Sequence, residues 1–366
     1  MKAWNRAKLL WGYLARREQP GGLPVEWIVE TTAKCNLYCP MCPREIHPQP
    51  KADMTEEIFD RLVAESAPAA EHMMLIGLGE PLLDAKIFDR IERCARHGIY
   101  TLLSTNGTLL TEEASARLLA SPLEHITFSF DGATKETFER YRKGARFEAV
   151  RDNFVRFARM KHERGAKVQI VVQMVQLEGT RAETEEFVRF WRSVPGVDQV
   201  RLKQDETVLL QPGAVHEPAD FRHPCHYLWR GPMYVRYNGD VYPCCQSYML
   251  GGEPVGRIGE QSIEQMWNSE EIRRMRRLHA AGRGGEVEIC SRCVTTIPHP
   301  VLVVGSLLFH GRWVRRLLPA VERLAMLAKL PVRLLSPPRQ APAQAEDLVQ
   351  IGAEKSGGGK DTKPGG

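Results

Sequence analysis

The residues best suited to chemistry are three cysteines, Cys35, Cys39 and Cys42, separated by three and then two residues. They follow a segment predicted to be a strand, Glu26–Thr31. Three thiolates at this spacing can bind three irons of a four-iron cluster and leave the fourth iron open. An open iron can take a further ligand, so the pattern predicts a catalytic cluster. A zinc site or an electron-transfer cluster would need a fourth ligand nearby.

Polar residues follow the next three predicted strands, at the point where each strand ends. Because the carboxyl ends of parallel strands meet at one edge of a sheet, we expect these residues to lie near the cysteines. Each segment alone is an ordinary turn or cap, and their common position is what indicates a site. In chain order they are Gly77–Pro81, Ser104–Gly107, Ser129 and Asp131, followed by Arg142.

A second group of cysteines lies in the last third of the chain. A predicted turn at Asn238 and Gly239 would bring the second member of this group back toward the first. Four thiolates suit one fully ligated iron–sulfur cluster, and they would also satisfy zinc. Cys245 is the alternative to its neighbour as a ligand, and the isolated Cys94 is expected in the core. The four expected ligands are Cys225, Cys244, Cys290 and Cys293.

Strands and helices alternate from about residue 25 to residue 210. Repeated βα units of this size imply a parallel sheet covered by helices. Six such units predict an α/β fold, a partial (β/α)6 barrel of the TIM type, with its site on the loops after the strands. The predicted strands are Glu26–Thr31, Met73–Gly77, Tyr100–Ser104, His125–Phe130, Val168–Met174 and Gln199–Leu202.

The texture of the sequence divides the chain into five parts. A small metal-stapled domain is expected where short strands, frequent glycines and five cysteines follow the barrel. The end of the chain is rich in Pro, Ala, Gln, Gly and Lys and is expected to be disordered. The parts are a basic amphipathic helix (1–24), the barrel (25–210), the metal-stapled domain (211–300), an apolar basic helical segment (301–335) and the tail (336–366).

Composition indicates a cytoplasmic enzyme that binds metal. The chain has 366 residues and nine cysteines, and no signal peptide or membrane-spanning stretch is visible. The cysteines are therefore interpreted as metal ligands in a reducing compartment, not as disulfides. The formal net charge is +5, and its basic excess belongs to the two ends. The core shows no sign of a nucleic-acid footprint.

The N-terminal helix has two interpretations. Trp4, Ala7, Trp11 and Leu14 recur at helical spacing, and five basic residues accompany one acidic residue in positions 1–20. We expect this helix to pack on the body of the protein. The alternative is a contact with the cytoplasmic face of a membrane, shared with the basic residues of 311–335, and a lipid-linked substrate.

The cysteine triad and Gly77–Pro81 resemble the signature segments of the radical S-adenosylmethionine (SAM) enzymes, with Leu78 where a glycine is usual. The resemblance implies a SAM-binding [4Fe–4S] cluster on the triad. It also implies cleavage of SAM to a 5′-deoxyadenosyl radical that abstracts hydrogen from a substrate, with flavodoxin or ferredoxin as the electron donor. The implied SAM contacts are Gly79 and Glu80 at the amino group, Ser104, Asn106 or Asp131 at the ribose, Ser129 and Arg142 at the carboxylate, and Met41 beside the adenine.

The second cysteine group resembles the SPASM/twitch domains that follow many radical SAM barrels. A full SPASM domain continues with further cysteines, and none follows Cys293 here. The resemblance therefore implies a single auxiliary [4Fe–4S] cluster, with spacing similar to that of a radical SAM dehydrogenase acting on an aminocyclitol. Such a cluster could accept an electron from a substrate radical, or could only staple the small domain.

These observations favour a radical SAM oxidoreductase acting on a small polar molecule, such as a sugar, a cyclitol or a related metabolite. A maturase of ribosomal peptides is the first alternative. The molybdenum-cofactor cyclase matches poorly in its second cysteine set, and sulfatase maturases need cysteines that this chain lacks. A non-catalytic iron–sulfur electron carrier would have no use for the polar strand-end residues. Lys203, Asp205 and Glu206 follow the last predicted strand and are candidates to face the substrate.

Overall fold

The computed structural model describes residues 1–308 except 46, 206–220, 222 and 294–299. Most of the expected helical segment 301–335 and all of the expected tail 336–366 therefore lie outside the described residues. Of the segment, only the start is described, as part of helix α14 (Pro300–Leu308).

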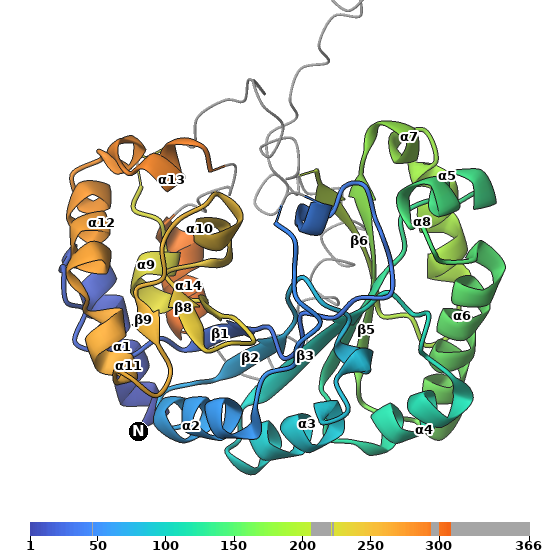
Figure 1. Ribbon diagram of the computed structural model, residues 1–366, viewed down its shortest axis with the longest axis horizontal. Coiled ribbons are helices and arrows are strands. Elements are labelled where there is room, and N and C mark those ends of the chain that lie inside the picture. Colours follow the sequence, from blue (N-terminus) through green and yellow to red (C-terminus); the bar gives the residue numbers. More distant parts are fainter. Residues whose placement is uncertain (46, 206–220, 222, 294–299, 309–366) are drawn as a thin grey trace, which may run out of the picture. The chain divides into compact units, whose positions relative to one another are not determined.

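Six parallel strands form the larger part of the sheet, in the order in which they occur along the chain (Figure 1). The strands β1 and β4 are buried almost throughout, as expected where helices cover one face of a parallel sheet and loops the other. The predicted partial barrel is confirmed, and each end of a predicted strand lies within three residues of the corresponding observed end. The strands are β1 (Glu26–Val29), β2 (His72–Leu75), β3 (Tyr100–Thr105), β4 (His125–Ser129), β5 (Gln169–Gln176) and β6 (Gln199–Gln204).

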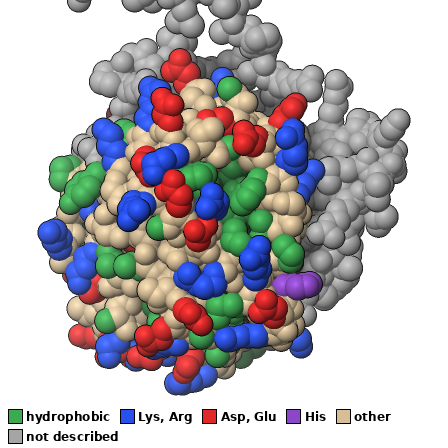
Figure 2. All heavy atoms as spheres, turned by 90° about the vertical axis from the view of Figure 1, so that its right-hand side faces the viewer, with side chains coloured by type: hydrophobic (Ala, Val, Ile, Leu, Met, Phe, Trp, Pro, Cys, Tyr) green, Lys and Arg blue, Asp and Glu red, His purple; other side chains and the backbone are tan. Residues whose placement is uncertain are grey.

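Helices line the outer side of this sheet (Figure 1), and the face over α6 and α8 mixes acidic and basic side chains (Figure 2). Three of the helices begin at a threonine whose hydroxyl accepts a backbone N–H: Thr55, Thr111 and Thr134. The helices are α2 (Glu56–Ser66), α3 (Ile87–Arg96), α4 (Glu112–Ala120), α5 (Lys135–Tyr141), α6 (Phe147–Arg164), α7 (Glu178–Arg181) and α8 (Thr184–Ser193).

A short break separates α7, which ends at Arg181, from α8, which begins at Thr184. Glu183 lies at the break and accepts hydrogen bonds from the backbone N–H of Ala133 and the hydroxyl of Thr134, at 2.5 and 2.7 Å. These contacts tie the interruption to the loop after β4. An apolar periodicity cannot reveal a break of this kind, because the cause is a polar contact distant in sequence.

The sheet does not end with the barrel strands. The strand β7 (Met233–Val235) pairs in parallel with β1, and β8 (Asp240–Tyr242) and β9 (Gly256–Arg257) continue the sheet in antiparallel fashion. The predicted hairpin turn is confirmed between β7 and β8, where Gly239 has a φ of +88°. At the other edge, β6 is polar and largely exposed, which protects an edge strand from unwanted pairing.

Short helices surround the hairpin and share a second core with the N-terminal helix α1 (Lys2–Leu14). Leu9 and Tyr13 of α1 pack there with Trp229, Met275 and residues of α14. No helix in the described part of the chain is both long and apolar enough to cross a bilayer. The short helices are α9 (Tyr227–Arg230), α10 (Cys245–Met249), α11 (Ile263–Trp267), α12 (Glu270–Ala280) and α13 (Glu288–Ser291), with 3-10 turns at Pro43–Glu45, Pro81–Leu83 and Gly284–Glu286.

The N-terminal helix packs on the body as expected, through Leu9, Gly12 and Tyr13. The apolar stripe that marked the helix in the sequence is exposed instead. Apolar residues occur on both faces of the helix, and periodicity alone does not tell which face is buried. The exposed members are Trp4, Ala7, Trp11 and Leu14.

Candidate functional site

A cavity of about 400 Å³ lies at the carboxyl ends of the barrel strands. Every residue expected to bind the first cluster or SAM lines it, although these residues come from five separate loops. Because the carboxyl ends of parallel strands share one edge, the fold brings together residues that are more than a hundred positions apart in the sequence. The residues are Cys35, Cys39, Met41, Cys42, Gly79, Glu80, Ser104, Asn106, Ser129, Asp131 and Arg142.

The cysteine loop after β1 is held from two sides. The backbone N–H of Tyr38 donates to the carbonyl of Lys143 at 3.0 Å, and the side chain of Asn36 donates to the hydroxyl of Thr108 at 2.8 Å. Within the loop, the N–H of Cys42 donates to the carbonyl of Cys39 at 2.9 Å. Backbone and side-chain contacts therefore fix the shape of the loop.

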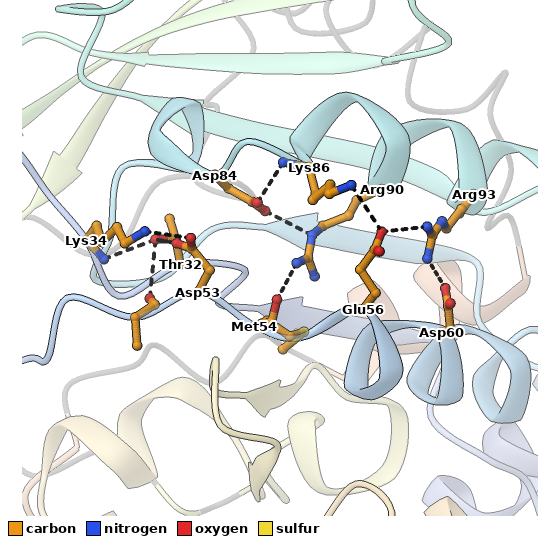
Figure 3. Close-up of polar contacts among 11 residues, drawn as sticks. Thr32, Lys34, Asp53, Met54, Glu56, Asp60, Asp84, Lys86, Arg90 and Arg93 are labelled. Atoms are coloured by element: carbon orange, nitrogen blue, oxygen red, sulfur yellow. Dashed lines mark hydrogen bonds and ion pairs between the residues drawn. The ribbon is translucent and has the colours of Figure 1, made fainter.

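A polar network fixes the root of this loop (Figure 3). The carboxylate of Asp53 accepts from the hydroxyl of Thr32 and the ammonium of Lys34, both at 2.6 Å. Beside it, the buried Asp84 forms an ion pair with Arg90 at 2.9 Å, and Arg90 also donates to the carbonyl of Met54 at 2.5 Å. The sequence offered no signal for this support, because its members are spread over three segments.

Gly79 is required by the approach of two loops. A Cβ atom on this residue would lie 2.0 Å from the carbonyl oxygen of Thr32 and 2.8 Å from that of Lys34. The next residue confirms the contact, since the N–H of Glu80 donates to the Lys34 carbonyl at 2.7 Å. The small residue therefore seats the Gly77–Pro81 segment directly against the base of the cysteine loop.

Glu80 is buried and held by three donors. Its carboxylate accepts from the hydroxyl of Thr105 and the N–H of Asn106, both at 2.7 Å, and from the N–H of Leu82 at 3.2 Å. Burial raises the pKa of Glu80, and these hydrogen bonds oppose the rise. The carboxylate is thus preorganised at the cavity wall, where a cation would meet a fixed partner.

Arg142 forms a buried ion pair with Asp131. Its Nε and Nη2 atoms lie 2.7 and 2.5 Å from Oδ2 of Asp131, whose Oδ1 accepts from the N–H of Val175 at 2.6 Å. Burial lowers the pKa of Arg142, but Asp131 and the thiols of Cys39 and Cys42 outweigh it and raise the pKa. Arg142 therefore places a fixed positive charge beside the first cysteine set.

The remaining polar residues of this wall already have partners. The hydroxyls of Ser104 and Ser129 lie 3.3 Å apart. The side-chain amide of Asn106 donates to Asn36 at 3.0 Å, and its oxygen accepts from the hydroxyl of Thr108 at 2.6 Å. Asn106 therefore also joins its own loop to the cysteine loop, a role that sequence reasoning missed.

The rest of the cavity lining contains residues that sequence reasoning did not find. Lys203 and Asp205 line it as expected, and Glu206 lies outside the described residues. Gln173 and Gln204 lie in or at the ends of β5 and β6, so the same reasoning about strand ends could have found them. The residues beyond the barrel carried no such signal: Tyr234, Cys245, Gln246, Met249 and Leu250.

The second cysteine set gathers outside this cavity. Its members come from before α9, from the residue before α10, and from in and after α13. Burial raises the pKa of Cys225 to about 12 and that of Cys244 well above its usual value, and neighbouring cysteines raise both further. Cys245 and the other three members all raise the pKa of Cys244, so five cysteines lie near one another here and Cys245 stays the alternative to Cys244 as a ligand.

His279 contacts this second set from α12. The backbone N–H of Cys225 donates to its Nδ1 at 3.4 Å, and its Nε2 lies 3.4 Å from Sγ of Cys290. Burial lowers the pKa of His279 to about 4, so the ring is neutral near pH 7. Because Nδ1 accepts a hydrogen bond, the ring proton is on Nε2 and points toward the Cys290 sulfur.

The donor sets fit iron–sulfur clusters better than single ions. Among the described residues, no three His, Cys, Asp or Glu side chains are gathered closely enough to hold one metal ion. Each thiolate of a four-iron cluster binds a different iron, so its ligands need not converge on one point. Cys94 takes no part: it is buried against the sulfur of Met73 at 3.5 Å, as expected of a core cysteine.

Two family models match the chain in the regions that contain the two cysteine sets. Residues 29–190 match the radical SAM superfamily, and residues 225–294 match an iron–sulfur cluster-binding domain called SPASM. The first match spans β1 to α8 and includes the cavity residues from Cys35 to Arg142. The second spans the hairpin β7–β8 and all four cysteines of the second set.

Similar proteins agree with these matches. A tungsten-containing aldehyde ferredoxin oxidoreductase cofactor-modifying protein of Pyrococcus furiosus is 23% identical over 291 residues, which cover 66% of this chain and 80% of that protein. The PqqA peptide cyclase of Granulibacter bethesdensis is 32% identical over 119 residues, about a third of each chain.

The solved structure of Streptococcus suis SuiB bound to precursor peptide SuiA has the same fold, with a TM-score of 0.57 and 14% identity over 69% of this chain and 66% of SuiB. With the triad lining the cavity, a second cysteine set outside it and the two family matches, this chain belongs to the radical SAM superfamily and contains a C-terminal SPASM domain.

Proposed function

We propose that this radical SAM enzyme is an oxidoreductase that oxidises a small polar substrate, such as a sugar, a cyclitol or a related metabolite. One observation carries the proposal: the cavity that contains the first cysteine set also reaches the second. Cys35, Cys39 and Cys42 line it. Cys245 lines it as well, and the adjacent Cys244 belongs to the second set.

The two domains imply a [4Fe–4S] cluster with SAM in the barrel and an auxiliary iron–sulfur cluster in the SPASM domain. We assign Cys35, Cys39 and Cys42 to the first cluster and Cys225, Cys244, Cys290 and Cys293 to the second. When bound and reduced by a donor such as flavodoxin or ferredoxin, the first cluster and SAM would supply a 5′-deoxyadenosyl radical that takes a hydrogen atom from the substrate, and the second cluster would accept the remaining electron as the substrate loses a proton.

The residues of this chain contribute binding, orientation and charge. The fixed carboxylate of Glu80 suits the ammonium group of SAM, and the guanidinium of Arg142 suits its carboxylate. We assign Ser104, Ser129, Asn106 and Asp131 to the same molecule, with Gly79 and Met41 in van der Waals contact. Apolar neighbours such as Ile28, Leu37 and Ile76 help to exclude water from the cavity.

The rest of the cavity lining provides charges and hydrogen-bonding groups that can bind a small polar substrate. Lys203 and Asp205 bring opposite charges, and Gln173, Gln204 and Gln246 bring amides that both donate and accept hydrogen bonds. Several such groups in one cavity fix the orientation of a molecule rich in hydroxyl or amino groups. The proposal includes a cytoplasmic location, because thiolate ligands require a reducing compartment.

Peptide maturation is the second candidate, because similar proteins include a PqqA peptide cyclase and SuiB with its precursor peptide. This chain spans only about a third of that cyclase, so the likeness supports the radical chemistry more than the choice of substrate. In a peptide maturase, these charged and amide side chains of the cavity would contact a peptide backbone instead of hydroxyl groups.

The test is anaerobic reconstitution with iron and sulfide, reduction, and incubation with SAM. We expect 5′-deoxyadenosine to form, and to form faster with the true substrate. The candidates come from the products of neighbouring genes: small metabolites on one side and short precursor peptides on the other. A metabolite that loses two hydrogens supports the proposal, whereas a crosslinked peptide supports the second candidate. A reduced protein that never cleaves SAM would be an electron carrier.

A further inference from the structure

The outer face of α1 concentrates exposed apolar surface. Seven large hydrophobic side chains are exposed in the described part of the chain, and four of them belong to α1 or to the residue before it. Trp4 and Trp11 are 69% and 62% exposed, and with Leu14 they lie along one side of the helix. A cluster of this kind marks an interaction surface more often than scattered single residues do. The four are Met1, Trp4, Trp11 and Leu14.

This exposure does not reflect a loosely attached helix. Arg6 forms an ion pair with Glu71 at 2.6 Å, and the side chain of Asn5 exchanges two hydrogen bonds with the backbone of Leu23, both at 2.8 Å. Tyr13 packs edge-on against Trp229 with ring centroids 5.9 Å apart. The inner face is thus fixed to the body, and the tryptophans are presented outward in a defined orientation.

The chain segment that contains these tryptophans is basic. Residues 1–17 contain five basic residues and no Asp or Glu. The ammonium of Lys8 lies 5.9 Å from the ring of Trp4, and Arg17 is exposed just beyond the helix. The face over α6 is different, because acidic and basic side chains alternate there (Figure 2). The outer face of α1 therefore combines aromatic surface with the exposed basic residues Lys8 and Arg17.

This charge decides between the occupants that could cover the face. A second copy would bring two basic surfaces together. The sequence of 311–335, which follows α14, has six basic residues and one acidic residue, so it too has the wrong sign. An anionic lipid surface matches both properties, since indoles favour the headgroup region and basic residues attract acidic lipids.

We propose that the outer face of α1 binds the surface of an anionic bilayer, with the indoles of Trp4 and Trp11 in the interfacial region and Lys8 and Arg17 at the headgroups. The contact is peripheral and reversible, because one short helix buries only a limited apolar area. It is independent of the reaction proposed above, since α1 contributes no residue to the lining of the cavity.

The test is sedimentation of the full chain with vesicles of phosphatidylcholine alone or mixed with phosphatidylglycerol, at low and high salt. We expect binding to the mixed vesicles that weakens with salt. The double variant Trp4→Ala/Trp11→Ala should bind at least roughly tenfold more weakly, because two indoles are lost from the interface. Phe190→Ala, which removes a 40% exposed aromatic from α8, is the matched control and should bind like the unchanged protein.

A second variant tests the charge separately from the aromatic surface. Lys8→Glu/Arg17→Glu should weaken binding to the mixed vesicles while iron content and SAM cleavage stay unchanged, which shows that the variant is folded. Failure of the unchanged protein to bind the mixed vesicles would overturn the proposal, as would full binding by the tryptophan variant. Protection of the tryptophans from acrylamide without vesicles would also overturn it, because the face would then be covered by protein.

Discussion

The two cysteine sets differ in their surroundings more than in their ligands. Cys35, Cys39 and Cys42 come from one loop and line a cavity, whereas the second set comes from three separate parts of the SPASM region and lies outside it. Three thiolates leave one iron of a four-iron cluster open to a molecule in the cavity, and four thiolates do not. The contrast indicates that an open iron next to a cavity distinguishes a reactive centre from an electron-transfer or structural one.

Their polar neighbours differ as well. The first set has the charged Arg142 beside it, held by the buried Asp131. The second has the neutral His279, whose ring proton points at Cys290. A fixed cation compensates thiolate charge strongly, whereas a single N–H donor adjusts it. Substitutions in the two sets should therefore have unequal consequences.

The largest effect is expected from Cys39→Ala. It should abolish formation of 5′-deoxyadenosine and lower the iron content from about eight to about four atoms per chain, because only the first cluster is lost. Iron analysis and chromatography of the reaction mixture measure both quantities. Cys94→Ala is the control and should keep both clusters, since its thiol lies in the core. Cleavage of SAM by the Cys39 variant would contradict the assignment.

The variant Cys290→Ala should separate the two sets functionally. We expect it to lose oxidised product but to keep cleavage of SAM at a reduced rate, because the cavity wall that holds the first set does not contain Cys290. Iron content should again fall to about four atoms per chain. Formation of normal product by this variant would show that the second set is structural and takes no electron from the substrate.

Arg142→Met tests the charge beside the first set. It leaves the carboxylate of Asp131, which is almost completely buried, without its cation, so the free energy of unfolding should fall by about 3 to 5 kcal/mol. Anaerobic denaturant titration measures this change. Arg142→Lys should recover part of the stability, since it restores a charge without the two-point contact. Equal losses in both variants would argue against a charge effect.

The smallest effect is expected from His279→Phe. Loss of the hydrogen bond to Cys290 should make the second cluster harder to reduce, by on the order of tens of millivolts, without changing iron content. A potentiometric titration followed by electron paramagnetic resonance resolves the two clusters. His279→Gln, which can still donate a hydrogen bond, should shift the potential less. A change confined to the first cluster would contradict the contact.

The parts of the site that could be predicted are those that leave a periodic signal in the sequence. The wall with Glu80 and Asp131 was found because hydrophobic runs reveal buried strands, and polar residues at their ends must share one edge. Gln246 and Tyr234 were missed, because the SPASM segment that brings them to the cavity has no such periodic signal. The packing of α1 on the body was predicted, but its buried face was not predictable, because Trp11 and Leu9 are both apolar and only packing decides between them.

The pairing of β7 with β1 has a consequence for the passage of electrons. Three register pairs, from Trp27 with Met233 to Val29 with Val235, join the two strands. The first cysteine loop follows β1, and Cys244 follows the hairpin that begins with β7. Electron tunnelling slows steeply with distance, and here the span between the two centres is set by a ladder of backbone hydrogen bonds instead of a flexible linker. For the function proposed above, the sheet therefore fixes the distance over which an electron would pass.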